Sequence, residues 1–256
     1  EHPEWVMHRP NEGGADGLFN LGDLEACKWM TEYLSKCISD WGIDILRIDF
    51  NIEPLPFWRA ADAPDRQGMA EIRYVEGLYS MWDALLKKHP GMTIDDCASG
   101  GRRIDLEMIS RSYPLWQSDT QCCGKAMPVQ DQVQNLGLSM YVPLHAGGVW
   151  AFDPYSFRSI ATTGCSICPD LSKDKKMEEA ARRMLDEVKS LRPYYLGDYY
   201  PVLAVTTSEA DWCGWQYDRP DLGGGFFTLF RRSESPYSAA EVSLRGLDQE
   251  AAYELK

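Results

Sequence analysis

Two aspartates of this chain lie where a carboxylate could take part in a reaction. Asp49 follows the apolar segment ILRI, and Asp119 ends the segment YPLWQSD. Between them, Asp96 and Cys97 follow the segment MTID, residues 92–95. If these segments are strands of a (β/α)8 barrel, their C-terminal ends surround one site. Two carboxylates that face a shared cavity there can act as a nucleophile and as a general acid and base.

Helices and strands alternate along the first part of the chain. Apolar residues recur at helical spacing over 24–38 and 72–86, and Asp23 is placed to cap the first helix. The segment IDILRIDF, residues 43–50, predicts a strand buried on both faces of a parallel sheet. The polar, proline-rich connection 51–68 is expected to lack regular structure, and loops of this length often carry function.

The alternation continues further along the chain, which is typical of a parallel sheet covered by helices. We expect a short helix at 105–110, strands within 113–119, 138–148 and 159–167, and a charged amphipathic helix at 177–191.

The composition changes near residue 200, where Gly, Ser and Pro begin to separate short apolar segments. We therefore predict an α/β protein with two domains: residues 1–200 form part of a (β/α)8 TIM-type barrel, and residues 201–256 begin a C-terminal all-β domain. A closed barrel needs eight strands, and only five or six are expected before residue 200. The barrel is thus expected to be truncated on its N-terminal side.

The composition favours a neutral ligand. The chain has 256 residues and a formal net charge of -13, so nucleic acid and anionic membranes would be repelled. No apolar run reaches the roughly 18 residues that span a bilayer, and no leader-like segment opens the chain. The eight cysteines are scattered, which is typical of reduced thiols and predicts a cytoplasmic protein.

Several of these residues also have an ordinary structural interpretation. Asp49 or Asp119 could simply cap a following helix, and Asp96 is more typical of a structural residue. The segment CASGG lacks the Lys-Ser/Thr of a phosphate-binding loop and predicts a tight turn. We expect His145 to be a buried, hydrogen-bonded histidine and not a ligand.

Two clusters resemble metal sites without completing one. Cys165 and Cys168 have the spacing of a zinc pair, but no second pair and no nearby histidine supplies four ligands. Several aspartates lie between residues 44 and 96, yet strand alternation points Asp44 and Asp95 away from their neighbours. We therefore expect neither a metal nor an organic cofactor.

The order of the motifs resembles a known enzyme family. WGIDILRIDFN, RYVEGLYSMWDALLKKHPG, DCASGGRRIDLE and PLWQSD follow the order and spacing of the catalytic half of glycoside hydrolase family 36, the retaining α-galactosidases and their relatives. HPEW and SFRS extend the resemblance over essentially the whole chain. It implies retaining hydrolysis of terminal α-D-galactosides, with an α-galactoside oligosaccharide as substrate and a homo-oligomer as a possible assembly.

The resemblance also assigns roles to residues. Asp49 falls on the nucleophile, and Asp119 falls on the acid/base of the family's Ser-Asp pair. Cys97 and Gly100 fall on the cysteine and a glycine that contact the sugar.

The family's Lys-Trp-Asp-x-Asn motif is changed here. Arg47 takes the place of the sugar-binding lysine, Ile48 replaces the tryptophan, and Asn51 is kept. Arg47 and Asn51 are therefore expected to bind the sugar, but a planar guanidinium holds a hydroxyl differently from an ammonium. Arg102 stands where a further glycine is common.

Other functions are compatible with the same motifs. Within the family, these are α-N-acetylgalactosaminidase activity and α-galactosyl transglycosylation. A catalytically silent carbohydrate-binding barrel and a metal-dependent hydrolase are alternatives of other classes.

Overall fold

The computed structural model describes residues 2–9 and 17–255 and divides into two compact units. The first unit comprises residues 1–98 and 103–113, and the second comprises residues 99–102 and 114–256. Within the described residues, no helix is both long and apolar enough to cross a membrane.

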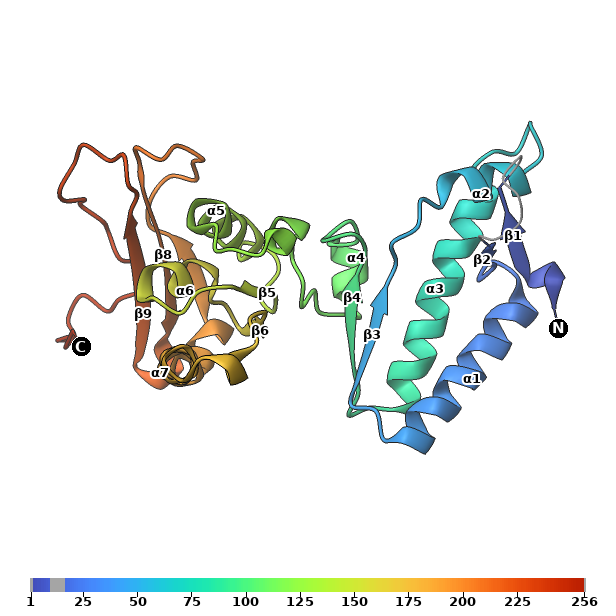
Figure 1. The fold of residues 1–256 in the computed structure, drawn as a ribbon, viewed down its shortest axis with the longest axis horizontal. Coiled ribbons are helices and arrows are strands. Elements are labelled where there is room, and N and C mark those ends of the chain that lie inside the picture. The colour runs from blue at the N-terminus through green and yellow to red at the C-terminus, as the bar shows by residue number, and fades with distance from the viewer. Residues whose placement is uncertain (1, 10–16, 256) are drawn as a thin grey trace. The chain divides into compact units, whose positions relative to one another are not determined.

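The first unit places two long helices beside a pair of parallel strands (Figure 1). A short antiparallel pair, β1–β2, precedes them. Its elements are η1 (Pro3–Trp5), β1 (Val6–His8), β2 (Gly17–Phe19), α1 (Leu24–Trp41), β3 (Ile45–Asp49), α2 (Leu55–Ala61), α3 (Met69–Lys88), β4 (Thr93–Cys97) and α4 (Leu106–Ile109).

The predicted start and end of the first helix are confirmed. The Asp23 carboxylate accepts hydrogen bonds from the Glu25 and Ala26 N–H groups, and Gly42 ends α1 in the left-handed conformation. The predicted second helix is α3. The core of this unit contains Trp82, Leu85, Phe57 and Ile94, all fully buried.

Two expectations for this unit are wrong. The residues of β3 are exposed or half-buried, because among the described strands β3 pairs with β4 alone and so lies at an edge. The connection 51–68 contains a helix, α2. Prolines do not prevent it, since Pro54 is its N-cap residue and Pro56 lies in its first turn, where no N–H is needed.

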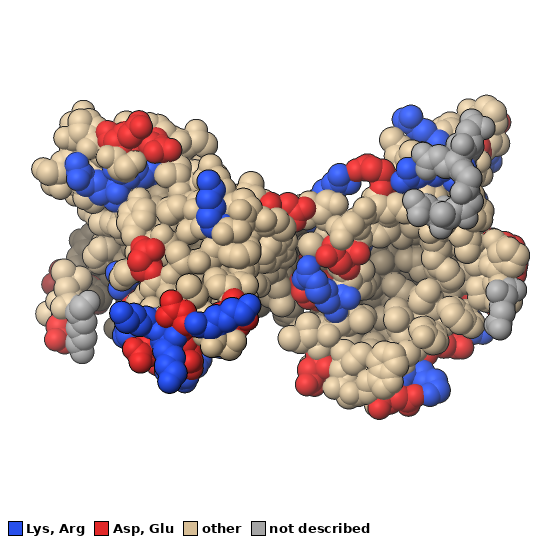
Figure 2. Space-filling model, viewed as in Figure 1, with Lys and Arg blue, Asp and Glu red and all other residues tan. Residues whose placement is uncertain are grey.

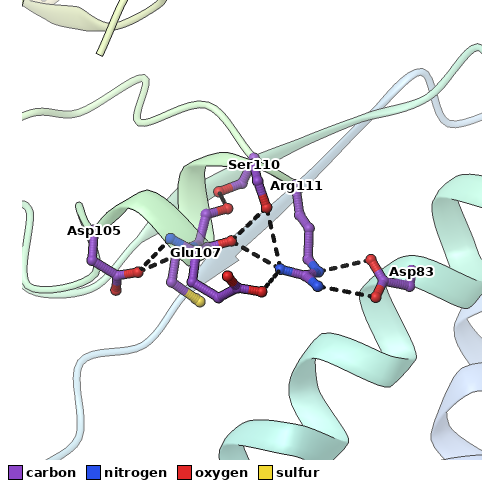
Figure 3. A network of polar contacts seen from close by, with 7 residues as sticks. Asp83, Asp105, Glu107, Ser110 and Arg111 are labelled. Atoms are coloured by element: carbon purple, nitrogen blue, oxygen red, sulfur yellow. Dashed lines mark hydrogen bonds and ion pairs between the residues drawn. The ribbon is translucent and has the colours of Figure 1, made fainter. Parts of the chain in front are cut away.

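Helix α4 is fastened to α3 by a polar network (Figure 3). Asp105 caps α4 through the Glu107 and Met108 N–H groups. Arg111 donates to both carboxylate oxygens of Asp83 on α3 at 2.7 and 3.2 Å, and to Glu107 at 2.7 Å. The Asp83 and Glu107 carboxylates raise the pKa of Arg111. The network anchors the segment that follows β4 and its glycine turn.

The second unit contains a parallel strand pair, β5–β6, and an antiparallel sheet in the order β7-β8-β9 (Figure 1). Residues of α5, η4 and the sheet share a core that includes Leu136, Tyr195, Trp215 and Phe230. The elements are η2 (Asp119–Cys123), α5 (Pro128–Leu138), β5 (Ala146–Val149), α6 (Pro154–Ile160), β6 (Gly164–Ile167), η3 (Leu171–Lys173), α7 (Lys175–Leu191), η4 (Arg192–Leu196), β7 (Asp198–Pro201), β8 (Trp212–Arg219), η5 (Pro220–Leu222) and β9 (Gly224–Arg231).

The predicted charged helix is α7, and its surface interleaves positive and negative side chains (Figure 2). Its buried side is small, with Ala181 and Val188 inside. Glu187 of α7 accepts two hydrogen bonds from Arg158 of α6, at 2.7 and 2.8 Å.

The strand expected over 113–119 does not form as predicted. Tyr113 makes a single parallel bridge to Asp95, and the chain then continues extended without a ladder. Pro114 has no N–H, so its carbonyl is the one backbone group with which it can hydrogen-bond. This carbonyl accepts a hydrogen bond from Ala146 N–H. Gln117 N–H donates in turn to the Ala146 carbonyl. The segment thus runs beside the start of β5 with too few hydrogen bonds to count as a strand.

Candidate active site

The parallel pairing of β3 and β4 gathers four polar or titratable side chains on one face. Arg47 lies opposite Asp95, and Asp49 lies opposite Cys97. Residues two apart on a strand point the same way, so all four share a face. The structure therefore brings the predicted residues Arg47, Asp49 and Cys97 together, with Cys97 buried and Asp49 more open. Asn51 is exposed just beyond the strand end.

Arg47 joins the two carboxylates of this face. Its Nη1 lies 2.5 Å from Asp95 Oδ2, and its Nη2 lies 3.4 Å from Asp49 Oδ2. Partial burial would lower the pKa of Arg47, but the Asp95 hydrogen bond and charge raise it above its ordinary value. The guanidinium is therefore a permanent cation beside Asp49.

Sequence reasoning missed Asp95. Alternation does point Asp95 away from Asp96, but the pairing of the strands then places it on the face of Asp49. The Asp95 side chain is 7% exposed, whereas that of Arg47 is 44% exposed. The register between β3 and β4 was the missing signal, because spacing along one strand cannot supply it.

Asp96 occupies the opposite face of β4. It is buried, and its Oδ1 lies 3.6 Å from Arg103 Nη1. The Arg103 guanidinium stacks 4.1 Å from the Phe50 ring centroid. Burial raises the pKa of Asp96 to about 6, and the Arg103 charge only partly opposes that shift.

The segment CASGG forms the tight turn that was predicted. Ser99, Gly100 and Gly101 all have positive φ, of 45°, 68° and 105°. In the second unit, Gly100 touches the backbone of Asp119, because a Cβ built on Gly100 would lie 2.2 Å from Asp119 N. Any side chain at Gly100 would therefore push Asp119 away.

Asp119 stands at the start of η2 with its carboxylate held by neighbours. Trp116 Nε1 donates to Asp119 Oδ1 at 3.2 Å, and the Cys122 thiol lies 3.7 Å from the same oxygen. The cap of η2 is Ser118, whose hydroxyl accepts from Thr120 N–H. Capping therefore does not explain Asp119.

Capping does not explain Asp49 either. The next helix, α2, has Pro54 as its N-cap residue and no side-chain cap. Both aspartates thus end their segments without the structural role that was the main alternative.

Strand β5 and the residue after it hold the segment that follows Asp119 through hydrogen bonds to Gln121. Gly148 N–H donates to Gln121 Oε1 at 2.8 Å, and Trp150 Nε1 donates to the Gln121 carbonyl at 2.5 Å. A Cβ on Gly148 would lie 2.6 Å from the Trp116 ring, so the absence of a side chain at Gly148 leaves room for the indole.

His145 is a core residue, as predicted. It is buried between Gln117 Oε1 at 2.5 Å and Ser139 Oγ at 3.1 Å, and burial lowers its pKa to about 4. Cys165 and Cys168 are thiols, as are the other six cysteines. Among the residues that the structure describes, no three His, Cys, Asp or Glu side chains gather in a group that could hold a metal ion.

Comparison with known proteins identifies the family. The sequence model of the melibiase family matches residues 1–150. The α-galactosidase AgaA of Geobacillus stearothermophilus is 23% identical over 275 residues, which cover 100% of this chain and 37% of AgaA. Alpha-galactosidase 1 of Pediococcus pentosaceus is 21% identical, over 99% of this chain and 36% of its own. This chain thus spans little more than a third of the length of these relatives.

Solved structures of family 36 α-galactosidases share the fold. AgaB of Geobacillus stearothermophilus superposes with a TM-score of 0.77 at 20% identity, over 96% of this chain and 36% of that chain. AgaA in complex with 1-deoxygalactonojirimycin gives a TM-score of 0.76 at 20% identity, over 97% of this chain and 36% of the AgaA chain. The matched family model and these relatives agree with the resemblance carried by the motifs. The chain belongs to the melibiase family, as a member of glycoside hydrolase family 36.

Proposed function

We propose that this chain carries the catalytic residues of an enzyme that hydrolyses terminal α-D-galactosides with retention of configuration. The observation that carries the proposal is the Asp49 carboxylate at the end of β3, partly open to solvent, beside the Arg47 cation and opposite Cys97. The relatives named α-galactosidases support the choice of sugar.

The reaction proceeds in two displacements. An Asp49 oxygen attacks the anomeric carbon of the galactoside while Asp119 gives its proton to the leaving oxygen, and the glycosidic bond breaks. Asp119, now a carboxylate, takes a proton from water, which attacks the same carbon and releases Asp49. Two inversions leave the product with the α configuration of the substrate.

The substrate is an α-galactoside oligosaccharide. Structures of AgaA variants hold stachyose and raffinose, which supports this class of ligand. Arg47, Asn51, Cys97 and Gly100 bind the galactosyl unit in this proposal.

The same proposal extends to the fold. Strands β3 to β6 form part of a (β/α)8 barrel within residues 1–200, and residues 201–256, with β8 and β9, begin a C-terminal β domain. A (β/α)8 barrel has eight strands, and this proposal assigns β3 to β6 to it. The family 36 structures that superpose on 96% of this chain support this arrangement. A cytoplasmic location and a homo-oligomeric assembly stay predictions from the sequence.

The test replaces Asp49 by Ala in the natural full-length protein. Turnover should vanish on every substrate, and azide should restore some of it by attacking from the vacated side to give a β-glycosyl azide. Asp44→Ala, an exposed position just before the same strand, is the matched control and should keep full activity. Unchanged hydrolysis by Asp49→Ala would contradict the proposal, as would saturable galactose binding without turnover in the unmodified protein.

A further inference from the structure

The buried carboxylate of Asp95 lies next to the proposed nucleophile but has no part in the two displacements. It lies on β4 directly opposite Arg47. The opposed pair Asp49 and Cys97 comes two residues further along both strands. Its side chain is 7% exposed, and burying a carboxylate is costly unless a cation or hydrogen bonds compensate. Its position therefore calls for a function tied to Arg47.

The geometry points to Asp95 as a positioning residue, an inference that rests on the proposed function. Asp95 Oδ2 holds Arg47 Nη1 at 2.5 Å, and this contact turns the other terminal nitrogen, Nη2, to within 3.4 Å of Asp49 Oδ2. Arg47 has a long, flexible stem and a half-exposed side chain, so without Asp95 it would sample many rotamers.

A fixed guanidinium can do two things at once. It has five N–H donors in a planar fork, so it can contact both carboxylates and still donate to a hydroxyl of the galactosyl unit. Asp95 thus sets the direction from which Arg47 approaches both the nucleophile and the sugar. Lysine in place of Arg47 would have a shorter reach and one compact ammonium instead of a planar fork, so it would hold the two carboxylates in a different geometry.

The reach of the two side chains gives a sharp test. Arg47→Lys shortens one partner and Asp95→Glu lengthens the other, so each single change misplaces the cation and the double change R47K/D95E brings the charges back together. In the full-length protein we expect kcat/KM to fall on the order of 100-fold in each single variant, because small misplacements near a reacting centre have effects of this size. The double variant should recover at least tenfold over either single variant.

Asp95→Asn and Asp96→Asn form the matched pair. Both positions are buried neighbours on β4 and both carboxylates face an arginine, but they lie on opposite faces. Asp95→Asn should lower kcat with a modest rise in KM, whereas Asp96→Asn should leave both unchanged. Thermal unfolding of each variant separates loss of fold from loss of positioning.

The outcomes distinguish this inference from the proposed function. Wild-type kinetics in Asp95→Asn, or equal kinetic losses in both asparagine variants, would overturn the positioning function while an inactive Asp49→Ala still upheld the reaction. Losses in R47K and D95E that simply add in the double variant would also contradict it, since residues that act as a unit are not additive.

Discussion

Gly100 and Asp119 are in contact through their backbones: a Cβ at Gly100 would lie 2.2 Å from Asp119 N and 2.7 Å from Asp119 Oδ1. The two residues are 19 positions apart in the sequence, and both were expected at the site from their motifs. The contact shows why the turn needs a glycine here: φ is 68°, and the space that a side chain would fill is already occupied by the proposed acid/base residue.

Gly100→Ala should therefore reduce turnover of a natural galactoside by on the order of 100-fold, because the methyl group must displace Asp119. Gly124→Ala is the control. It has a similar φ of 76° and nothing within 4 Å of the added Cβ, so it carries the same backbone strain without the collision. Equal activities of the two variants, measured with a galactoside whose leaving group is a sugar, would show that the contact has no catalytic consequence.

Asp119→Ala should affect substrates unequally. Leaving groups of low pKa, such as nitrophenolate, depart without a proton, whereas a sugar alkoxide needs one. Cleavage of a nitrophenyl galactoside to the glycosyl-enzyme should therefore lose far less rate than cleavage of a natural disaccharide. Pre-steady-state rates on both substrates measure this difference, and equal losses would count against Asp119 as the acid/base.

His145 should make the protein sensitive to acid. Its pKa is about 4 in the folded protein and near 6.5 in an unfolded chain, so the unfolded chain takes up a proton first as the pH falls. Stability is lost between about pH 6.5 and 4, by about 3 kcal/mol for this group alone. His145→Gln keeps a polar side chain but cannot titrate. Urea unfolding at pH 7 and 4.5 should show that this variant loses less stability on acidification than the wild type. Identical losses of stability would contradict the view that His145 causes the acid sensitivity.

Asp96 should have the opposite pH dependence. Its pKa is raised to about 6, chiefly by burial, from an ordinary value near 4, so the folded protein binds a proton more tightly than the unfolded chain. The contribution of Asp96 to the free energy of unfolding is favourable at low pH and is lost as the pH rises from about 4 to 6. The difference in unfolding free energy between Asp96→Asn and the wild type should therefore shift in favour of the variant by up to about 3 kcal/mol from pH 4 to pH 7.5. A variant that is less stable at pH 7.5, by the same urea measurement, would show that the Arg103 pair outweighs burial.

Local sequence signals predicted the elements whose stability comes from their own residues. Asp23, Gly42 and the apolar spacing placed α1 correctly, and the same spacing placed α3. They failed for the burial of β3, which depends on the strands that pair with it, and for the loop expected at 51–68. The composition of 51–68 did not exclude α2, because its prolines lie at the N-terminal end of the helix, where they are tolerated.

The candidate site divides in the same way. Motif order assigned Asp49, Cys97, Gly100 and Asp119 to the candidate site, since each belongs to a short segment that can be interpreted by itself. The motifs could not identify Asp95, because its relation to Asp49 depends on how β3 pairs with β4. That pairing places Asp95 opposite Arg47, from which it is 48 residues away in the sequence. Pairing is set by the packing of both strands against the rest of the protein.

The most direct test of the account is to trap the glycosyl-enzyme. A fluorinated galactosyl fluoride has a good leaving group, and its added fluorine slows the second displacement, so the sugar should stay bonded to the nucleophile of the full-length protein. Peptide mass mapping should then find one galactosyl label, on the Asp49 carboxylate, and Asp49→Asn should remain unlabelled. A label on Asp95, Asp119 or any other residue, or no label while the reagent is turned over, would contradict the assignment of Asp49 as the nucleophile.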